Sequence, residues 1–256
     1  IMTSRFMPLG NSRNKDALSL AIGMSTQSVT WQVSHPSRGP LDSGSIRYLD
    51  AFPQIAGMGF MDCLTGDVLA PPMLFVAALD EVFKCVAASR NFDITNIKRL
   101  TGDAQQHMTV YLNGTFEQTL SQLDSGKSLA EQLRNIFSLP WGLIWMNNST
   151  DVTTYAELLP GGAARFCDIT GSLPTKRFFG PAISLVASKC SGYWEDTDSV
   201  TLLCGFCASI CCSKPAPLEQ GDAAGGNLMD IRKREWSDEI LSALDPLVPN
   251  LSKKLP

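Results

Sequence analysis

Two neighbouring polar residues have the hydrogen-bonding chemistry that a sugar hydroxyl requires. Gln106 and His107 follow Gln105 at the start of an apolar segment. A side-chain amide donates and accepts, and a neutral imidazole does the same through its two nitrogens. A lone histidine is also a common structural residue, so a sugar site and a structural role both remain open. The only other histidine, His35, precedes Pro36 in an expected loop.

A loop of small residues that carries one carboxylate is a second candidate. Residues 221–227 read Gly-Asp-Ala-Ala-Gly-Gly-Asn, and Asp222 is the only acid among them. Glycine lets a ligand approach the backbone closely, so the segment predicts either a ligand-contacting loop or a solvated turn. It has neither the Gly-Lys-Ser/Thr of a P-loop nor the spaced glycines of a dinucleotide site, which excludes both patterns.

Four of the eight cysteines lie close together, at Cys204, Cys207, Cys211 and Cys212. This spacing invites a zinc or redox interpretation. Structural zinc sites usually pair two such motifs across a longer loop, and none is present here. The neighbouring residues are apolar, and a buried cysteine packs as a small hydrophobic residue. Core packing is therefore favoured over metal or thiol chemistry.

Composition limits the class of protein. The 256 residues are 44% hydrophobic and 18% charged, with a net charge of −4, which indicates a globular chain. The mild acidity argues against a nucleic-acid surface. The longest apolar run, 200–212, is too short for a membrane span of about 20 residues. The start of the chain shows no apolar signal segment, so we expect a cytoplasmic protein with reduced thiols and no membrane partner.

The elements that must position these residues follow from local patterns. Segments 17–22 and 27–34 predict a β-hairpin with its turn at 23–26, because Val29, Trp31 and Val33 alternate. Residues 36–66 are rich in Pro, Gly, Ser and Asp and predict a loop with short strands.

Helices and strands alternate through the rest of the chain. We expect strands at 97–102, 108–112 and 142–146, with an Asn113-Gly114 turn after the second. We expect helices at 72–89, 128–137, from 150 to about 159, at 200–212 and at 237–244, with Ser128 and Ser237 as caps. Hairpin strands followed by alternating helices and strands predict an α/β fold with a mixed β-sheet flanked by helices.

Five segments, read together and in order, resemble sugar kinases of the FGGY family, and most closely the eukaryotic xylulose kinases. The segments are Ile22-Gly-Met-Ser-Thr-Gln27, similar to the phosphate-loop hairpin; Gln105-Gln-His107, similar to the sugar-contact motif; Ile144-Trp-Met-Asn-Asn-Ser-Thr150; Thr170-Gly-Ser172 with Arg177-Phe-Phe-Gly-Pro181; and Asp222-Ala-Ala-Gly225 with the stretch through Trp236-Ser237. The resemblance runs from about residue 17 to the end of the chain.

The resemblance implies an actin/ribonuclease-H-like ATPase lobe. Residues 1–256 would form the N-terminal sugar-binding lobe, C-terminally incomplete and without the lobe that holds most of the ATP site. Its implied substrate is D-xylulose, phosphorylated with ATP and Mg²⁺, neither of which should bind tightly to this chain alone. The resemblance implies that the sugar contacts are Gln106, His107, Arg177 and Asp222, and that Ser25 and Thr26 approach the ATP phosphates. Gly23 stands where the family has a carboxylate for magnesium, so we expect no metal ligand in this chain.

Three departures from the family pattern bear on activity. The hairpin aspartate is replaced by Gly23, and the aspartate of the Trp-Met-Asp motif is Asn147. The Gly-Asp-Asn motif with the catalytic base does not occur, so we expect no catalytic residue in this chain. The interpretation is a xylulose kinase whose complete protein makes xylulose 5-phosphate. The alternative is an inactive sugar-binding or regulatory remnant, and a thiol or zinc protein is a third possibility.

Overall fold

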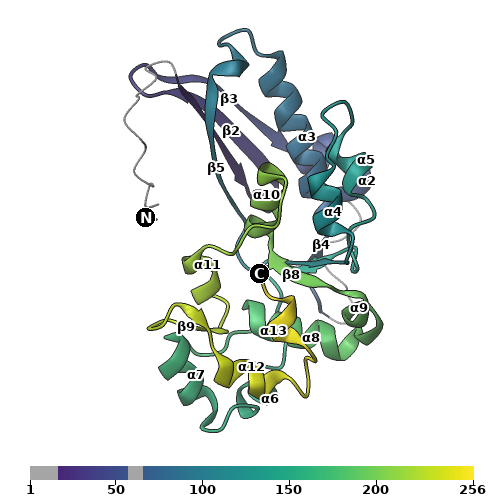
Figure 1. The fold of residues 1–256 in the computed structure, drawn as a ribbon, viewed down its shortest axis with the longest axis vertical. Helices are drawn as coiled ribbons and strands as arrows, with labels where there is room; N and C mark the ends of the chain where they lie inside the picture. The colour runs from purple at the N-terminus through teal and green to yellow at the C-terminus, as the bar shows by residue number, and fades with distance from the viewer. Residues whose placement is uncertain (1–16, 57–65) are drawn as a thin grey trace.

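The computed structural model describes residues 17–56 and 66–256. Its central element is a four-stranded mixed sheet in the order β3-β2-β1-β5 (Figure 1). Its strands are β1 (Leu18–Met24), β2 (Ser28–His35), β3 (Gly39–Arg47) and β5 (Ile97–Ala104). β1 pairs antiparallel with β2 and parallel with β5, which confirms the predicted hairpin and mixed sheet.

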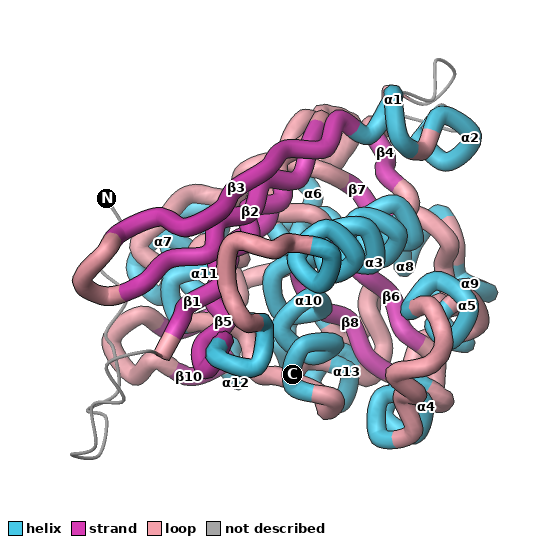
Figure 2. The backbone as a smooth tube through the Cα atoms, turned by 90° about the horizontal axis from the view of Figure 1, so that it is seen from above, coloured by secondary structure: helices cyan, strands magenta, loops and turns pink. Residues whose placement is uncertain are grey.

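Side-chain alternation gives this sheet one apolar and one polar face. Leu20, Ile22 and Met24 of β1 are buried together with Val29, Trp31 and Val33 of β2. The helices α3 (Pro72–Ala88) and α10 (Leu203–Cys212) pack on this face, as Figure 2 shows from above. On the other face, Thr30 and Gln32 are exposed. Burial of the apolar face fixes the strand register, since a shift by one residue would expose it.

The segment after the hairpin differs from the expected loop. Residues 39–47 form one continuous edge strand, β3, despite their Pro, Gly and Ser content. An edge strand pairs on one side only, so it tolerates a proline and does not need apolar alternation. Pro40 lies where the β2–β3 register shifts. The short helices α1 (Tyr48–Ala51) and α2 (Pro53–Ala56) follow, and the rest of the predicted loop, 57–65, lies outside the described residues.

A second packed region lies below the sheet in Figure 1. It begins where β6 (Thr109–Leu112) pairs antiparallel with β8 (Ser199–Leu202). Tyr155, Phe166 and Phe179 are among the buried residues of its core. Its other elements are α6 (Val152–Glu157), α7 (Gly162–Thr170), α8 (Phe179–Lys189), α9 (Ser191–Asp196), α11 (Gln220–Ala224), β9 (Met229–Asp230), β10 (Glu235–Trp236), α12 (Asp238–Leu244) and α13 (Leu251–Lys254).

The remaining elements are short. They are β4 (Leu69–Ala70), the 3₁₀ helix η1 (Ile94–Asn96), α4 (Phe116–Ser121), α5 (Leu129–Leu133) and β7 (Gly142–Leu143), which pairs with β4. Of these, α4 and α5 pack with the core of the sheet. Both predicted caps are confirmed. The Ser128 hydroxyl accepts a bond from the Glu131 N–H at 3.1 Å, and the Ser237 hydroxyl accepts one from the Ile240 N–H at 3.3 Å. None of the described helices is both long enough and apolar enough to cross a membrane.

The predicted buried helix at 200–212 is partly wrong. Its first residues form β8, and only the segment from Leu203 to Cys212 is helical. A continuous apolar run fits a buried strand as well as a buried helix, and here pairing with β6 determines which one forms. The Asn113-Gly114 turn exists, but it leads into α4, because the partner of β6 lies far along the chain in β8.

Candidate functional site

The turn between β5 and β6 presents His107. The residue has a left-handed backbone, with φ of 64°, which histidine adopts more readily than most residues. The N–H of Gln105 donates to the Met24 carbonyl at 2.7 Å, which ties this turn to the end of the β1–β2 hairpin. His107 therefore lies beside the carboxyl ends of the parallel strands β1 and β5, the edge where α/β sheets usually bind ligands.

The imidazole of His107 contacts two segments that are remote in sequence. Its ring centroid lies 5.2 Å from that of Phe178, in a tilted arrangement. Its Cε1 atom lies 3.9 Å from the position that a Cβ of Gly225 would take. A larger residue at 225 would bring its side chain toward the imidazole. The His107 turn, the start of α8 and the loop after α11 thus meet at one place, which we call the His107 cluster: His107, Arg177, Phe178, Asp222 and Gly225.

The charges of this cluster have opposite effects on His107. Burial lowers the pKa of the imidazole because the charged form loses hydration, and the positive charge of Arg177 lowers it further. The carboxylate of Asp222 acts in the opposite direction. Both residues are therefore close enough to His107 to interact electrostatically. Because burial and Arg177 prevail, the imidazole favours its neutral form, with one nitrogen donor and one acceptor available to hydroxyl groups.

Asp222 is held from two sides. The thiol of Cys204, at the start of α10, donates to the Asp222 carboxylate at 2.8 Å. Burial and this carboxylate both raise the pKa of the thiol, so it stays protonated and remains a donor. The Glu219 side chain caps α11 by accepting bonds from the N–H groups of Gly221 and Asp222 at 2.7 and 3.3 Å. The loop of small residues is thus an ordered helical turn rather than a solvated one.

The hairpin turn with Ser25 and Thr26 lies next to the same site. The Thr26 hydroxyl donates to the Gln105 amide oxygen at 3.1 Å and accepts a bond from the Trp145 indole N–H at 2.9 Å. Ser25 uses its hydroxyl within the turn, donating to the Ser28 carbonyl at 2.9 Å. Ser25 therefore shapes the turn, and Thr26 joins it to the turn that carries His107.

The sequence-predicted residues thus divide into two neighbouring groups. His107 interacts with both Arg177 and Asp222, while Ser25 and Thr26 lie at the hairpin. Gln106 is exposed on the turn next to His107. Sequence reasoning gave no separate role to Trp145, which is 43% exposed although its indole is held by Thr26. An exposed tryptophan directly after a short apolar strand was the available clue.

The structure gives Asn147 a structural role. Its side chain is buried, accepts a bond from the Val68 N–H and donates to the Thr150 hydroxyl, both at 3.3 Å. The Ser149 hydroxyl also donates to its amide oxygen. An amide meets these partners without a buried charge. Asn147 therefore joins the Val68 segment to the turn at Thr150.

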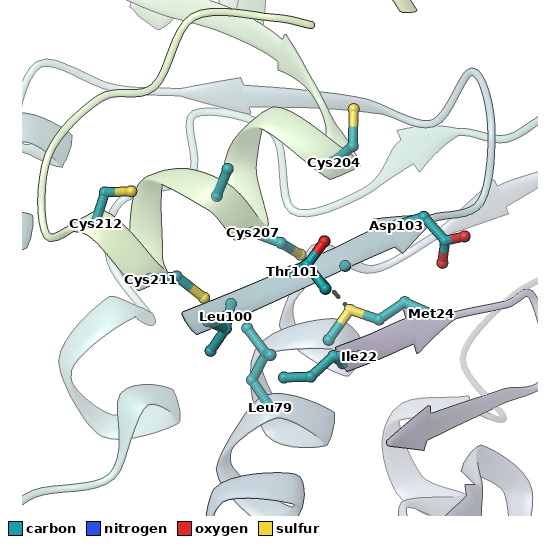
Figure 3. Close-up of a pocket in the computed structure, with 12 residues that line it drawn as sticks. Ile22, Met24, Leu79, Leu100, Thr101, Asp103, Cys204, Cys207, Cys211 and Cys212 are labelled. Carbon is teal, nitrogen blue, oxygen red and sulfur yellow. Dashed lines mark hydrogen bonds between the residues drawn. The ribbon is translucent and has the colours of Figure 1, made fainter. Parts of the chain in front are cut away.

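The cysteines of α10 line a cavity of about 230 Å³ between this helix and β5 (Figure 3). The Cys207 thiol contacts the Met24 sulfur at 3.6 Å and packs with the core of the sheet, as predicted for a packing residue. Cys211 and Cys212 are exposed instead, because they lie on the last turn of α10. Across residues 17–56 and 66–256, no three His, Cys, Asp or Glu side chains are grouped to hold a metal ion.

Comparison with known proteins identifies the relatives of this chain. It is 32% identical to xylulose kinase 2 of Arabidopsis thaliana over 94% of its own length and 43% of that protein. It is also 32% identical to the xylulose kinase of Rattus norvegicus, over 73% of the chain and 34% of the rat protein. The chain therefore spans less than half the length of these relatives. No family model matches it.

Solved structures identify the fold. A "xyloylose kinase" from Brucella ovis matches 93% of this chain and 42% of its own, with a TM-score of 0.64 and 16% identity. A ligand-bound xylulose kinase from Lactobacillus acidophilus matches 94% of this chain and 41% of its own, with a TM-score of 0.66 and 14% identity. The mixed sheet flanked by helices is the actin/ribonuclease-H-like ATPase fold of these kinases. The chain is a homologue of eukaryotic xylulose kinases.

Proposed function

We propose that this chain is the sugar-binding N-terminal lobe of a kinase that phosphorylates D-xylulose with ATP. The observation that carries the proposal is the His107 cluster, in which residues from three remote segments of the family pattern interact. The reaction would transfer the γ-phosphoryl group of ATP to the terminal hydroxyl, giving xylulose 5-phosphate. We propose the cytoplasm, where ATP is available, as its compartment.

The cluster suits a polyol. Neutral His107 offers a donor and an acceptor, Arg177 offers donors, and Asp222 offers acceptors. Gln106, exposed on the same turn, adds an amide. Because Cys204 and Glu219 hold the segment with Asp222, its carboxylate is oriented before the sugar arrives. Pre-orientation lowers the entropic cost of binding.

The hairpin suits the phosphate end of ATP. Mg²⁺ in kinases is usually bound by substrate phosphates with one or two carboxylates. Bound Mg²⁺ would neutralise charge on the transferred phosphoryl group. Thr26 and Ser25 would face the phosphates. The proton of the sugar hydroxyl requires a carboxylate base outside the 256 residues, since Gly-Asp-Asn is absent from them.

Titration calorimetry with D-xylulose tests the sugar site. His107→Asn keeps a residue that tolerates a left-handed backbone, and Arg177→Ala removes the cation. Loss of the half-buried His107 should weaken binding by about 1–3 kcal/mol, and loss of the exposed Arg177 should weaken it less. Lys176→Ala is the matched control, because it removes the same charge from the neighbouring exposed residue. Binding of D-xylulose that neither variant weakens would disprove the assignment.

A sugar-binding protein without catalysis is the second candidate, and Gly23 favours it because the hairpin lacks its expected carboxylate. The two candidates differ in the complete protein of which this chain would form part. A kinase releases ADP only when D-xylulose is present, whereas a binding protein retains the sugar without consuming ATP. Calorimetry and an ADP-release assay on the same preparation separate them.

A further inference from the structure

The strand next to Gly23 carries a carboxylate at the corresponding position. β1 and β5 are parallel, and Gly23 pairs with Asp103 in their register. Paired residues of neighbouring strands direct their side chains to the same face of a sheet. The Asp103 Oδ1 atom lies 3.2 Å from the point that a Cβ of residue 23 would occupy. The carboxylate of Asp103 thus lies beside the position from which a side chain of residue 23 would project.

We propose that Asp103 supplies the hairpin carboxylate that Gly23 does not, and that it helps to bind the divalent cation of the nucleotide. The proposal rests on the proposed kinase function. Its geometric basis is position. The family pattern has the acid on β1 at residue 23, and this chain has one on the neighbouring strand β5, again at the carboxyl ends of the two strands. Figure 3 shows the Asp103 carboxylate at the end of β5, directed away from the cysteines of α10.

The surroundings of Asp103 favour this role over that of an ordinary surface charge. Asp103 is exposed near the end of the edge strand β5. Among the described residues, no Lys or Arg forms an ion pair with it. The Thr30 hydroxyl lies on the same side, 3.1 Å from the Cβ position of residue 23. Carboxylate and hydroxyl oxygens are hard donors, which Mg²⁺ and Mn²⁺ accept.

The glycine has a spatial consequence as well. A side chain at residue 23 would contact both the Thr30 hydroxyl and the Asp103 carboxylate, at 3.1 and 3.2 Å. An aspartate at position 23 would place two negative charges side by side, which is unfavourable without a bound cation. The Asp103 carboxylate therefore has room on β5 because Gly23 of β1 carries no side chain there.

The test is paramagnetic broadening of amide NMR signals of the 256-residue chain by Mn²⁺ with ATP. In the wild type, added Mn²⁺·ATP should broaden the signals of Ser25, Thr26 and the end of β5. Asp103→Asn should raise the Mn²⁺ concentration that gives the same broadening by about tenfold, the lower end of the usual effect of disturbing a metal site. Glu117→Gln, which neutralises an exposed acid on α4, should leave it unchanged.

The exchange variant Gly23→Asp with Asp103→Ala returns the carboxylate to β1. It should restore broadening to within about threefold of the wild type, since the two positions are adjacent. Without Mn²⁺, the Gly23→Asp variant should have a lower melting temperature than the wild type. Addition of Mn²⁺ and ATP should restore the melting temperature.

Equal Mn²⁺ dependence in wild type and Asp103→Asn would overturn the proposal, and so would a wild type that shows no broadening at the hairpin. Sugar binding, measured by calorimetry on the same samples, distinguishes failure of the Asp103 proposal from failure of the proposed function. If D-xylulose still binds through His107, only the role of Asp103 is disproved. If D-xylulose does not bind, the proposed function fails independently.

Discussion

The Asn227 side-chain amide donates to the Thr170 hydroxyl at 2.9 Å, joining two segments that are far apart in the chain. The same amide donates to the Ser172 carbonyl at 3.1 Å. Asn227 is fully buried and has a left-handed backbone. It therefore fixes the end of α11, with Asp222 in the helix and Gly225 directly after it, against the turn that precedes Arg177 and α8.

Asn227→Ala should destabilise the fold. It leaves the half-buried Ser172 carbonyl and the buried Thr170 hydroxyl without this partner and places alanine at a positive φ, so we expect a loss of about 1–3 kcal/mol. Urea unfolding measures the change. Asn250→Ala is the matched control, because Asn250 has a similar φ of 61° but is exposed. An equal loss in both variants would mean that backbone strain, and not the buried amide, explains the effect.

The pKa of His107 should respond in opposite directions to its two charged neighbours. Arg177→Gln removes a cation that lowers this pKa, so the pKa should rise. Asp222→Asn removes an anion that raises it, so the pKa should fall further. NMR titration of the imidazole measures both. Lys176→Gln should have a smaller effect than Arg177→Gln, and equal effects would contradict the cluster.

Stability should depend on pH through the same group. The pKa of His107 is lowered from 6.5 in the folded state, so the unfolded chain binds more protons below that pH. The stabilisation is fully present above about pH 6.5 and is lost as pH falls toward the folded-state pKa. The free energy of unfolding should therefore decrease below pH 6.5 less steeply in His107→Asn than in wild type. Parallel profiles would disprove the contribution.

Asn147→Ala should lower stability without changing sugar affinity. The residue connects the segment at Val68 with the turn at Thr150 through buried hydrogen bonds. Their loss should reduce the free energy of unfolding by about 1–3 kcal/mol. Calorimetry with D-xylulose on the folded variant should give wild-type affinity. Weaker binding at full folding would instead place Asn147 in the sugar site.

The purified chain should contain no stoichiometric zinc, and a chelator should not change its melting temperature. The reason is that Cys207 packs in the core and Cys204 bonds to Asp222, and burial raises the pKa of both thiols. Thiols that stay protonated are poor metal ligands. Elemental analysis and calorimetric melting with EDTA measure this. One zinc per chain, lost together with the fold, would restore the metal interpretation.

The 256-residue chain should not phosphorylate D-xylulose by itself. It has no Gly-Asp-Asn motif, and general-base assistance contributes about 10²–10⁴ in rate. A coupled ADP-release assay with ATP and Mg²⁺ measures the turnover. Sugar-dependent turnover that survives repurification and disappears in His107→Asn would contradict this expectation.

The sequence by itself determined the hairpin, the long helix α3 and the helix caps at Ser128 and Ser237. These depend on local patterns: alternation along a strand, apolar spacing along a helix, and a hydroxyl that accepts a backbone N–H. It also indicated His107 and Asp222 as candidates from their residue types, and Arg177 through motifs shared with a family.

Tertiary structure alone decided where non-local partners lie. Residues 199–202 form a strand because β6 is beside them, and β3 is continuous because β2 pairs with it. Asn147 is structural because Val68 and Thr150 surround it. Only the parallel register, which sets Asp103 beside Gly23, indicates a role for Asp103. Contacts between residues 80 positions apart leave no periodic pattern in a sequence, because burial and pairing arise only when the chain folds.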